Sequence, residues 1–218
     1  MFNRILCVPH KLGQNKIGVD KTPLILKYFF SKNNTFFKLE NTNNFYYNLK
    51  HLYQINNSFN EPRINIGGDH SMSIATVANT INRFPNTKII WIDAHADINT
   101  FESSKSKNYH GMPLGFLTGL CKDNNFNYIK NLVPFRNIIF VGVRELDNFE
   151  NYIIKKENIN IITIDDIQTN YNRSLGRILD FVRDDNIHLS FDVDVMDPNI
   201  IPSTGTPVPN GLELNEAK

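Results

Sequence analysis

The sequence predicts an α/β fold built on a mostly parallel β-sheet. Short apolar runs that favour strands alternate with capped or amphipathic segments that favour helices, from one end of the chain to the other. Residues 138–141 are apolar without interruption, which is typical of a strand covered on both faces of its sheet. The 218 residues contain no internal repeat and no linker-like segment, so we expect a single domain over residues 1–218.

The first half of the chain is expected to supply three strands and three helices. The apolar runs that predict strands cover residues 3–8, 35–39 and 63–66. The segments that predict helices run from residue 22 to about residue 30, and over residues 44–57 and 72–83. Thr22 and Pro23 suit the N-cap and the first position of the first helix, and Ser71 can cap the third.

The second half continues the same alternation. Its predicted strands cover residues 88–93, 137–143, 160–164 and 187–191. Its predicted helices cover residues 114–120, 148–158 and 171–183. Strands separated by helical segments are typical of parallel pairing, because the chain must cross over the sheet before it pairs again.

The composition is globular and argues against several classes of partner. Hydrophobic residues make up 41% of the chain, charged residues 21%, and the formal net charge is +1. No Lys/Arg block suggests a nucleic-acid surface, and no apolar run reaches the roughly 18 residues of a membrane span. Two cysteines without a CxxC motif, and the lack of a recognisable signal peptide, lead us to expect a cytoplasmic protein.

Residues 91–97 place three ionisable side chains directly after an apolar run. Residues at i, i+2 and i+4 of an extended chain point to one side, so Asp93, His95 and Asp97 converge if the chain stays extended. Two carboxylates and an imidazole would be costly to bury unpaired, and a divalent cation is the simplest compensation. The alternative from this stretch alone is a set of solvated loop residues.

Two further strand ends carry similar side chains. His70 follows the third strand, and Asp192 and Asp194 follow the last. In a parallel sheet these ends lie at one edge, where four carboxylates and two imidazoles suit two divalent cations better than one. Without thiolates the set favours manganese over zinc and leaves iron, cobalt and nickel open. Two metals can lower the pKa of a shared water enough for hydrolase chemistry at neutral pH.

Three motifs resemble the signatures of the ureohydrolases, the family of arginases, agmatinases and formiminoglutamases. They are Gly67-Gly68-Asp69-His70-Ser71, Asp93-Ala94-His95-Ala96-Asp97, and Ser190-Phe191-Asp192-Val193-Asp194 with Asp197-Pro198. Residues 18–23 and 204–207 are similar to further arginase segments, so the resemblance covers nearly the whole chain. It implies a three-layer arginase-like fold and hydrolysis of L-arginine to L-ornithine and urea.

The resemblance also implies two Mn²⁺ per chain. One would be held by His70, Asp93, Asp97 and Asp192. The other would be held by Asp93, His95, Asp192 and Asp194, with Asp93 and Asp192 bridging. Asp97 and His110 would be the catalytic residues, His110 giving a proton to the leaving amine.

The amino-acid head of the substrate would be bound by two segments that are similar to arginase loops. The residues implied for the α-carboxylate are Asn99, Ser106 and Asn108, and those for the α-amino group are Asp147 and Glu150. Amide and hydroxyl donors suit a carboxylate, and carboxylates suit an ammonium. The alternatives are a solvated loop for Ser106 and Asn108, and an exposed helix charge for Glu150.

Family members continue beyond the position that matches Lys218. The resemblance implies that a central strand, between those ending at His70 and Asp192, and C-terminal helices are missing, so that the domain is incomplete. We then expect the half carrying His70 to lose its tie to the other half, and this chain alone to be destabilised and weakly active or inactive. The alternatives to an arginase are an agmatinase or other ureohydrolase and a weakly active or inactive metal-binding remnant. Family members form trimers or hexamers, so a homo-oligomer is also expected.

Overall fold

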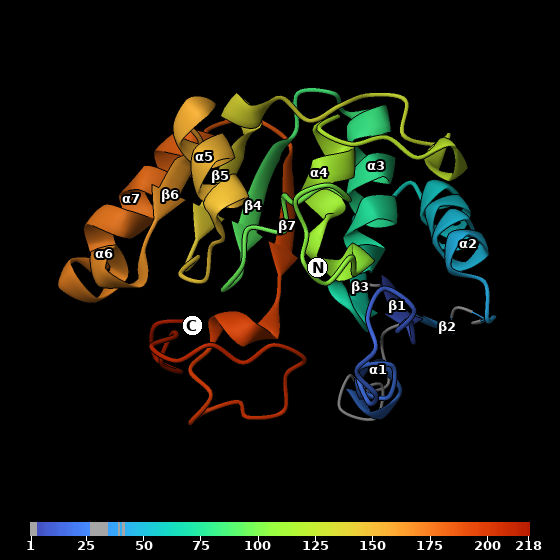
Figure 1. The fold of residues 1–218 in the computed structure, drawn as a ribbon, viewed down its shortest axis with the longest axis horizontal. Coiled ribbons are helices and arrows are strands. Elements are labelled where there is room, and N and C mark those ends of the chain that lie inside the picture. The colour runs from blue at the N-terminus through green and yellow to red at the C-terminus, as the bar shows by residue number, and fades with distance from the viewer. Residues whose placement is uncertain (1–3, 27–34, 39, 41) are drawn as a thin grey trace.

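The computed structural model describes residues 4–26, 35–38, 40 and 42–218 and shows an α/β fold. Strands and helices alternate along the chain, and every strand pairing in the described residues is parallel. Helices lie against the strands in Figure 1. The predicted fold class is confirmed.

The strands form two parallel sheets, ordered β2-β1-β3 and β6-β5-β4-β7. The strand bounds are β1 Arg4–Val8, β2 Thr35–Lys38, β3 Ile64–Gly67, β4 Lys88–Ile92, β5 Ile138–Val141, β6 Asn160–Ile162 and β7 Ile187–Phe191. All seven predicted strands are present close to their expected ends. Residues 3 and 39, which the predictions included, lie outside the described residues.

The helices are those expected, with one addition. Their bounds are α1 Thr22–Leu26, α2 Phe45–Asn57, α3 Ser73–Arg83, α4 Pro113–Leu117, α5 Asn148–Lys156, α6 Ile164–Thr169 and α7 Tyr171–Val182. The expected continuation of the first helix to residue 30 lies outside the described residues. Helix α6 was not predicted. Thr163 and Asp166 form a capping box that ends β6 early and starts the helix.

The predicted cap at Ser71 is wrong. The carboxylate of Asp69 accepts a hydrogen bond from the Ser71 backbone N–H, so the cap lies two residues earlier. It begins a short 3₁₀ helix, η1 (His70–Met72), which leads into α3. The earlier start lets His70 sit inside a fixed turn rather than in a free loop.

The expected gap in the sheet is present, but the expectation that the two halves are untied is wrong. Within the described residues no ladder joins β3 to β7, and each is the edge strand of its sheet. However, Val8 of β1 belongs to the same buried cluster as Ile89 and Trp91 of β4. Thr80 of α3 also lies 2.8 Å from His188 of β7, Oγ1 to Nδ1. Side-chain packing therefore connects the sheets without a shared ladder.

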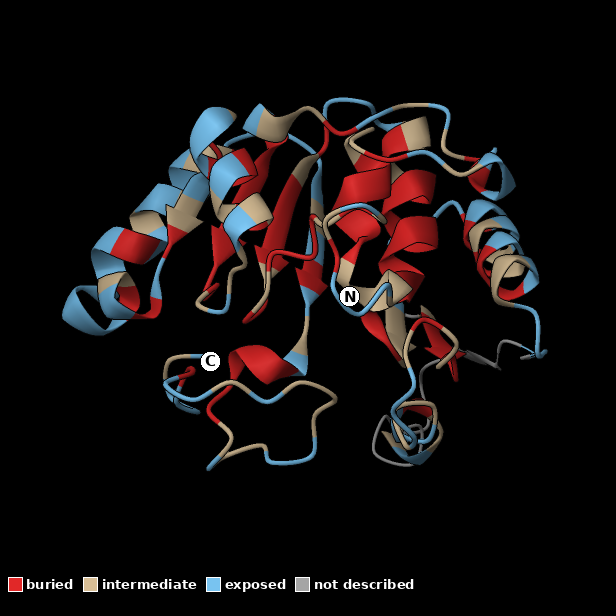
Figure 2. Cartoon of the chain, in the orientation of Figure 1, coloured by how far each residue is buried: buried red, intermediate tan, exposed pale blue. Residues whose placement is uncertain are grey.

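Strand β7 alternates between a covered and an uncovered face. Ser190 is buried, whereas Ile187, Leu189 and Phe191 are about half exposed, at 49%, 56% and 47%. Figure 2 shows the sheet interior as buried, with exposed residues concentrated on the outer helices. None of the helices in the described part of the chain has the length and apolar character needed to cross a membrane.

Candidate metal centre

The carboxyl ends of three strands deliver the candidate ligands. Strand β3 leads to His70 through Gly67 and Gly68, and a Cβ on Gly68 would lie 1.6 Å from the carbonyl oxygen of His10. Strand β4 leads into residues 93–97. Strand β7 leads to the short 3₁₀ helix η5 (Val193–Val195). Asp192 caps this helix, because its carboxylate accepts a hydrogen bond from the Asp194 backbone N–H. Local backbone chemistry thus fixes each ligand-bearing turn.

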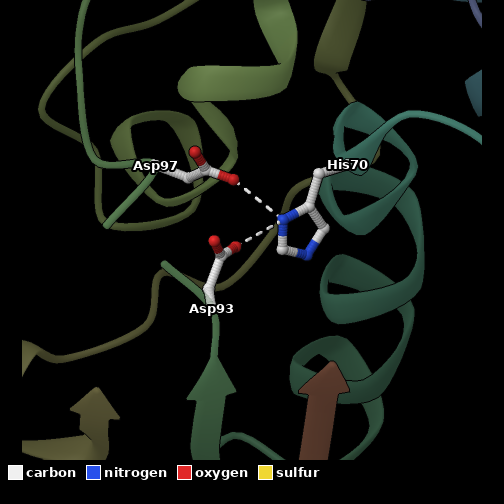
Figure 3. Close-up of side chains that lie close together, drawn as sticks. All are labelled: His70, Asp93 and Asp97. Carbon is white, nitrogen blue, oxygen red and sulfur yellow. Dashed lines mark ion pairs between the residues drawn. The ribbon is translucent and has the colours of Figure 1, made fainter. Parts of the chain in front are cut away.

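The first group of side chains surrounds His70. Its Nδ1 lies 2.8 Å from Asp97 Oδ2 and 2.9 Å from Asp93 Oδ2, as Figure 3 shows. Asp192 Oδ2 lies 3.4 Å from the same nitrogen. Asp97 has a φ of 49°, so the chain does not stay extended as far as expected. An aspartate tolerates this left-handed conformation, and its carboxylate still reaches His70.

A second group surrounds His95. Its Nδ1 lies 3.2 Å from Asp194 Oδ2 and 3.4 Å from Asp93 Oδ1. Asp93 therefore turns one oxygen to His70 and the other to His95. Ligand atoms of His70, Asp93 and Asp97 lie within 4.8 Å of one another, and so do those of Asp93, His95 and Asp194. The structure brings all six predicted ligands together around Asp93.

The donor set fits divalent cations. Asp93 is 1% exposed, and neither its Oδ2 nor His70 Nδ1 makes a well-formed hydrogen bond within the described residues. These two buried atoms face each other with only ionic contact between them. Oxygen and imidazole ligands without thiolate suit manganese and similar metals. A cation between the two groups would give His70 Nδ1 and Asp93 Oδ2 the coordination that no well-formed hydrogen bond supplies.

The electrostatics of the cluster reflect crowded carboxylates. Burial, followed by the negative charge of Asp93, raises the pKa of Asp97 to about 8 and that of Asp192 to about 7. Burial opposes charge on His95, yet the carboxylates of Asp194 and Asp93, which accept hydrogen bonds from its imidazole, raise its pKa to about 11. The pKa of His70 also rises well above its usual value, against its burial, because Asp93 and Asp97 face it. Imidazole–carboxylate ion pairs therefore link the side chains of this cluster.

Several neighbours of the cluster were not assigned a role from the sequence. Ser190 Oγ lies 2.8 Å from His70 Nε2, and Thr206 Oγ1 donates to Asp194 Oδ2 at 2.8 Å. The guanidinium of Arg144 donates to the carbonyl oxygens of Gly142, Asp194, Val195, Val208 and Pro209. Ser190 was detectable, because it precedes Asp192 by two residues and so shares its strand face. The Arg144 contacts depend on chain folding and had no sequence signal.

His110 lies at the rim of the cluster in η2 (Tyr109–Gly111). Its backbone N–H donates to the Gly13 carbonyl at 3.2 Å, which joins the first loop to this turn. Burial lowers the pKa of its imidazole, and positive charge on His95 and His70 acts in the same direction, opposed by Asp69. The structure therefore places this side chain within electrostatic reach of both ligand groups.

The predicted substrate residues fall into two sets. Asn99 Nδ2 donates to Asp147 Oδ2 at 2.8 Å, and Asp147 and Glu150 form the capping box of α5. Glu150 is 6% exposed, so the alternative of an exposed helix charge is wrong. Ser106 is exposed, and Asn108 does not use its side chain to cap η2. Both lie on the loop that leads to His110.

Comparisons with known proteins agree on one family. The sequence profile described as "Arginase family" matches residues 19–218. An arginase from Coccidioides immitis is 42% identical over 168 residues, covering 70% of this chain and 51% of that protein. An arginase from Entamoeba histolytica is 33% identical over 244 aligned residues, covering 97% of this chain and 82% of that protein.

Solved structures point the same way. The crystal structure of Entamoeba histolytica arginase in complex with L-ornithine superposes with a TM-score of 0.90 at 31% identity. That match covers 99% of this chain and 84% of the other. The chain spans about half the length of two curated fungal arginases that it matches.

Proposed function

Since the chain belongs to the arginase family, we propose that it hydrolyses the guanidinium group of L-arginine to L-ornithine and urea. The observation that carries this proposal is the cluster of six ionisable side chains in which the two oxygens of Asp93 face His70 and His95. The related arginase that was solved with L-ornithine supports the same product. A hydrolase needs an activated water, and this cluster is the chain's means of providing one.

We propose Mn²⁺ as the metal, with two ions per chain. The residues that would hold one ion are His70, Asp93, Asp97 and Asp192, and those for the other are Asp93, His95, Asp192 and Asp194. Bound there, the ions supply a water whose pKa is low enough for attack on the guanidinium carbon. The contact between Asp192 and His70 supports placing Asp192 among the residues that would hold the first ion. Asp93 would serve both sets through its two oxygens.

His110 is the proposed proton donor to the leaving amine. Burial lowers the pKa of its imidazole, so its protonated form is a stronger acid than an ordinary imidazolium. Its backbone N–H donates to the Gly13 carbonyl, which holds the turn that carries it. Asp97 is proposed as the second catalytic residue, since its carboxylate lies beside His70 at the centre of the site.

Five polar residues are proposed to bind the amino-acid head of arginine. They are Asn99, Ser106 and Asn108 for the α-carboxylate, and Asp147 and Glu150 for the α-amino group. The hydrogen bond between Asn99 and Asp147 supports a shared role, because it places an amide donor and a carboxylate acceptor side by side. A zwitterionic head presents the matching pair of charges. Agmatine has no α-carboxylate and would leave the amide donors without a partner.

The test is turnover by the purified 218-residue chain after loading with Mn²⁺. We expect ornithine and urea from L-arginine, a much lower kcat/KM for agmatine, and about two Mn²⁺ per chain by elemental analysis. Asp93→Asn should abolish turnover and lower the metal content, whereas Asp180→Asn, an exposed carboxylate on α7, should change neither. A chain that holds two Mn²⁺ yet releases no urea would be a metal-binding remnant, and faster turnover of agmatine would make it an agmatinase.

A further inference from the structure

Tyr109 lies between Asn108 and His110, and its side chain enters an aromatic cluster. Its ring centroid is 4.3 Å from that of Phe45, 5.2 Å from that of Phe101 and 6.0 Å from that of Phe116. Residues on either side of it are therefore joined to a packed part of the molecule. Aromatic packing restricts where the ring lies, but a hydroxyl group must still find a hydrogen-bond partner there.

The hydroxyl of Tyr109 begins a chain of hydrogen bonds that has a defined direction. Its hydroxyl lies 2.5 Å from that of Tyr46, and Tyr46 donates to Asp123 Oδ2 at 2.8 Å. A carboxylate only accepts, so the single proton of Tyr46 points to Asp123 and Tyr109 must donate to Tyr46. Burial raises the pKa of both phenols above their usual value, which keeps both protons in place near neutral pH.

The two partners of Tyr109 come from separate, structured elements. Tyr46 lies in the first turn of α2, and Asp123 caps η3 (Asn124–Phe126) by accepting from the Asn125 backbone N–H. On its other side η2 is held by the hydrogen bond from the His110 N–H to the Gly13 carbonyl. The turn is thus attached on one side to the first loop and on the other to α2 and η3.

We propose that Tyr46 and Asp123 are positioning residues that fix η2, and with it Asn108 and His110, through the hydroxyl of Tyr109. The effect of this on catalysis rests on the proposed function. Neither residue touches the ligand cluster, so each acts only through Tyr109. Losing one neutral hydrogen bond in the chain should change the population of the fixed turn by about fivefold.

The direct test is hydrogen exchange of the amides of residues 108–111 in the Mn²⁺-loaded chain. Tyr46→Phe and Tyr109→Phe should each speed exchange by about fivefold, and the double variant should be no faster than either single one, because all three break one chain. The matched control is Tyr53→Phe, on the same helix α2, which removes the acceptor of a hydrogen bond from Asn82. Unchanged exchange at residues 108–111 in Tyr109→Phe overturns the proposal. If Tyr46→Phe does not fold, the result for Tyr109→Phe alone is the test.

Kinetics separate the proposal from the proposed function. With an active parent chain, kcat/KM for L-arginine should fall about fivefold in Tyr46→Phe, with the metal content unchanged and Tyr53→Phe at the parent value. Faster exchange without any change in kcat or KM would overturn the positioning role. An inactive parent chain whose exchange still responds as expected would refute arginine hydrolysis and leave the hydroxyl chain established as the anchor of η2.

Discussion

The imidazole of His70 stacks on the indole of Trp91, with ring centroids 4.4 Å apart and an interplanar angle of 22°. Trp91 is fully buried in β4 and is the only tryptophan of the chain. One face of a candidate metal ligand therefore rests on the single strong fluorophore. A change in charge at His70 acts directly on that fluorophore.

Binding of Mn²⁺ should change the emission of Trp91, because the cation alters the charge of the stacked imidazole. We expect a saturable change on titration that a chelator reverses. His70→Asn should remove most of the response, whereas His51→Asn on α2, whose ring lies 5.8 Å from that of Tyr47, should retain it. Bound Mn²⁺ that leaves the emission unaltered would contradict the placement of a cation at His70.

Metal binding should release protons at pH 7.5. The pKa of His95 is raised to about 11 and that of Asp97 to about 8, so these two groups hold protons before binding. Ligands must lose these protons to bind a cation. The affinity for Mn²⁺ should therefore fall about tenfold for each unit by which the pH is lowered, for each proton released. Calorimetry in buffers of different ionisation enthalpy measures the number of protons that each chain releases when it binds Mn²⁺. A binding enthalpy that is independent of the buffer would mean that no ligand is protonated.

Ser190→Ala should weaken Mn²⁺ binding by about 10- to 100-fold, the usual effect of removing a partner of a ligating histidine. When Nδ1 of His70 faces the cation, Nε2 carries the proton and donates to Ser190 Oγ at 2.8 Å. Without that acceptor the ring loses its orientation and a buried N–H loses its partner. Titration of Mn²⁺ measures the effect. Ser174→Ala, also buried but on α7, is the control and should bind as the parent chain does.

Glu150 should make the protein less stable as the pH rises from about 4.5 to about 7. Burial raises the pKa of Glu150 from 4.5 to about 7, so the folded state favours the protonated carboxyl. The stabilisation is present below pH 4.5 and is lost as the pH passes the folded pKa, a change of up to about 3 kcal/mol. The sign is opposite to that of a salt-bridged carboxylate.

Glu150→Gln removes this titration, so we expect its free energy of unfolding to vary less with pH than that of the parent chain. Denaturant unfolding at pH 5 and pH 8 measures the difference. Glu213→Gln, an exposed carboxylate near the end of the chain, should follow the parent chain at both pH values. Equal pH dependence in Glu150→Gln and the parent would show that the carboxyl ionises freely in the folded state.

Much of the fold could be predicted because its signals are local. Apolar runs marked all seven strands, and glycines or aspartates at the ends of β3, β4 and β7 marked where each strand stops. The ligands followed from one general fact, that parallel strands bring their carboxyl ends to one edge. Helix α6 was missed although Thr163 and Asp166 carry a capping box, because the apolar residues before them favoured a longer strand.

Other features depend on contacts between distant segments. Trp91 stacks on a residue that is 21 positions earlier in the chain, and Tyr46 meets Tyr109 across 63 positions. The core that joins the two sheets also lies outside any local pattern. Pairings of this kind are decided by which surfaces pack together.

The sequence by itself determined the strands, the fold class and the identity of six candidate ligands, because hydrophobic periodicity and ligand chemistry act over a few residues. Only the tertiary structure decided that His70 rests on Trp91 and Ser190, and that the hydroxyl of Tyr109 beside His110 meets that of Tyr46. Those relationships depend on distances of a few ångströms between segments far apart in sequence. Such distances are set by the sum of packing and hydrogen bonding over the whole domain.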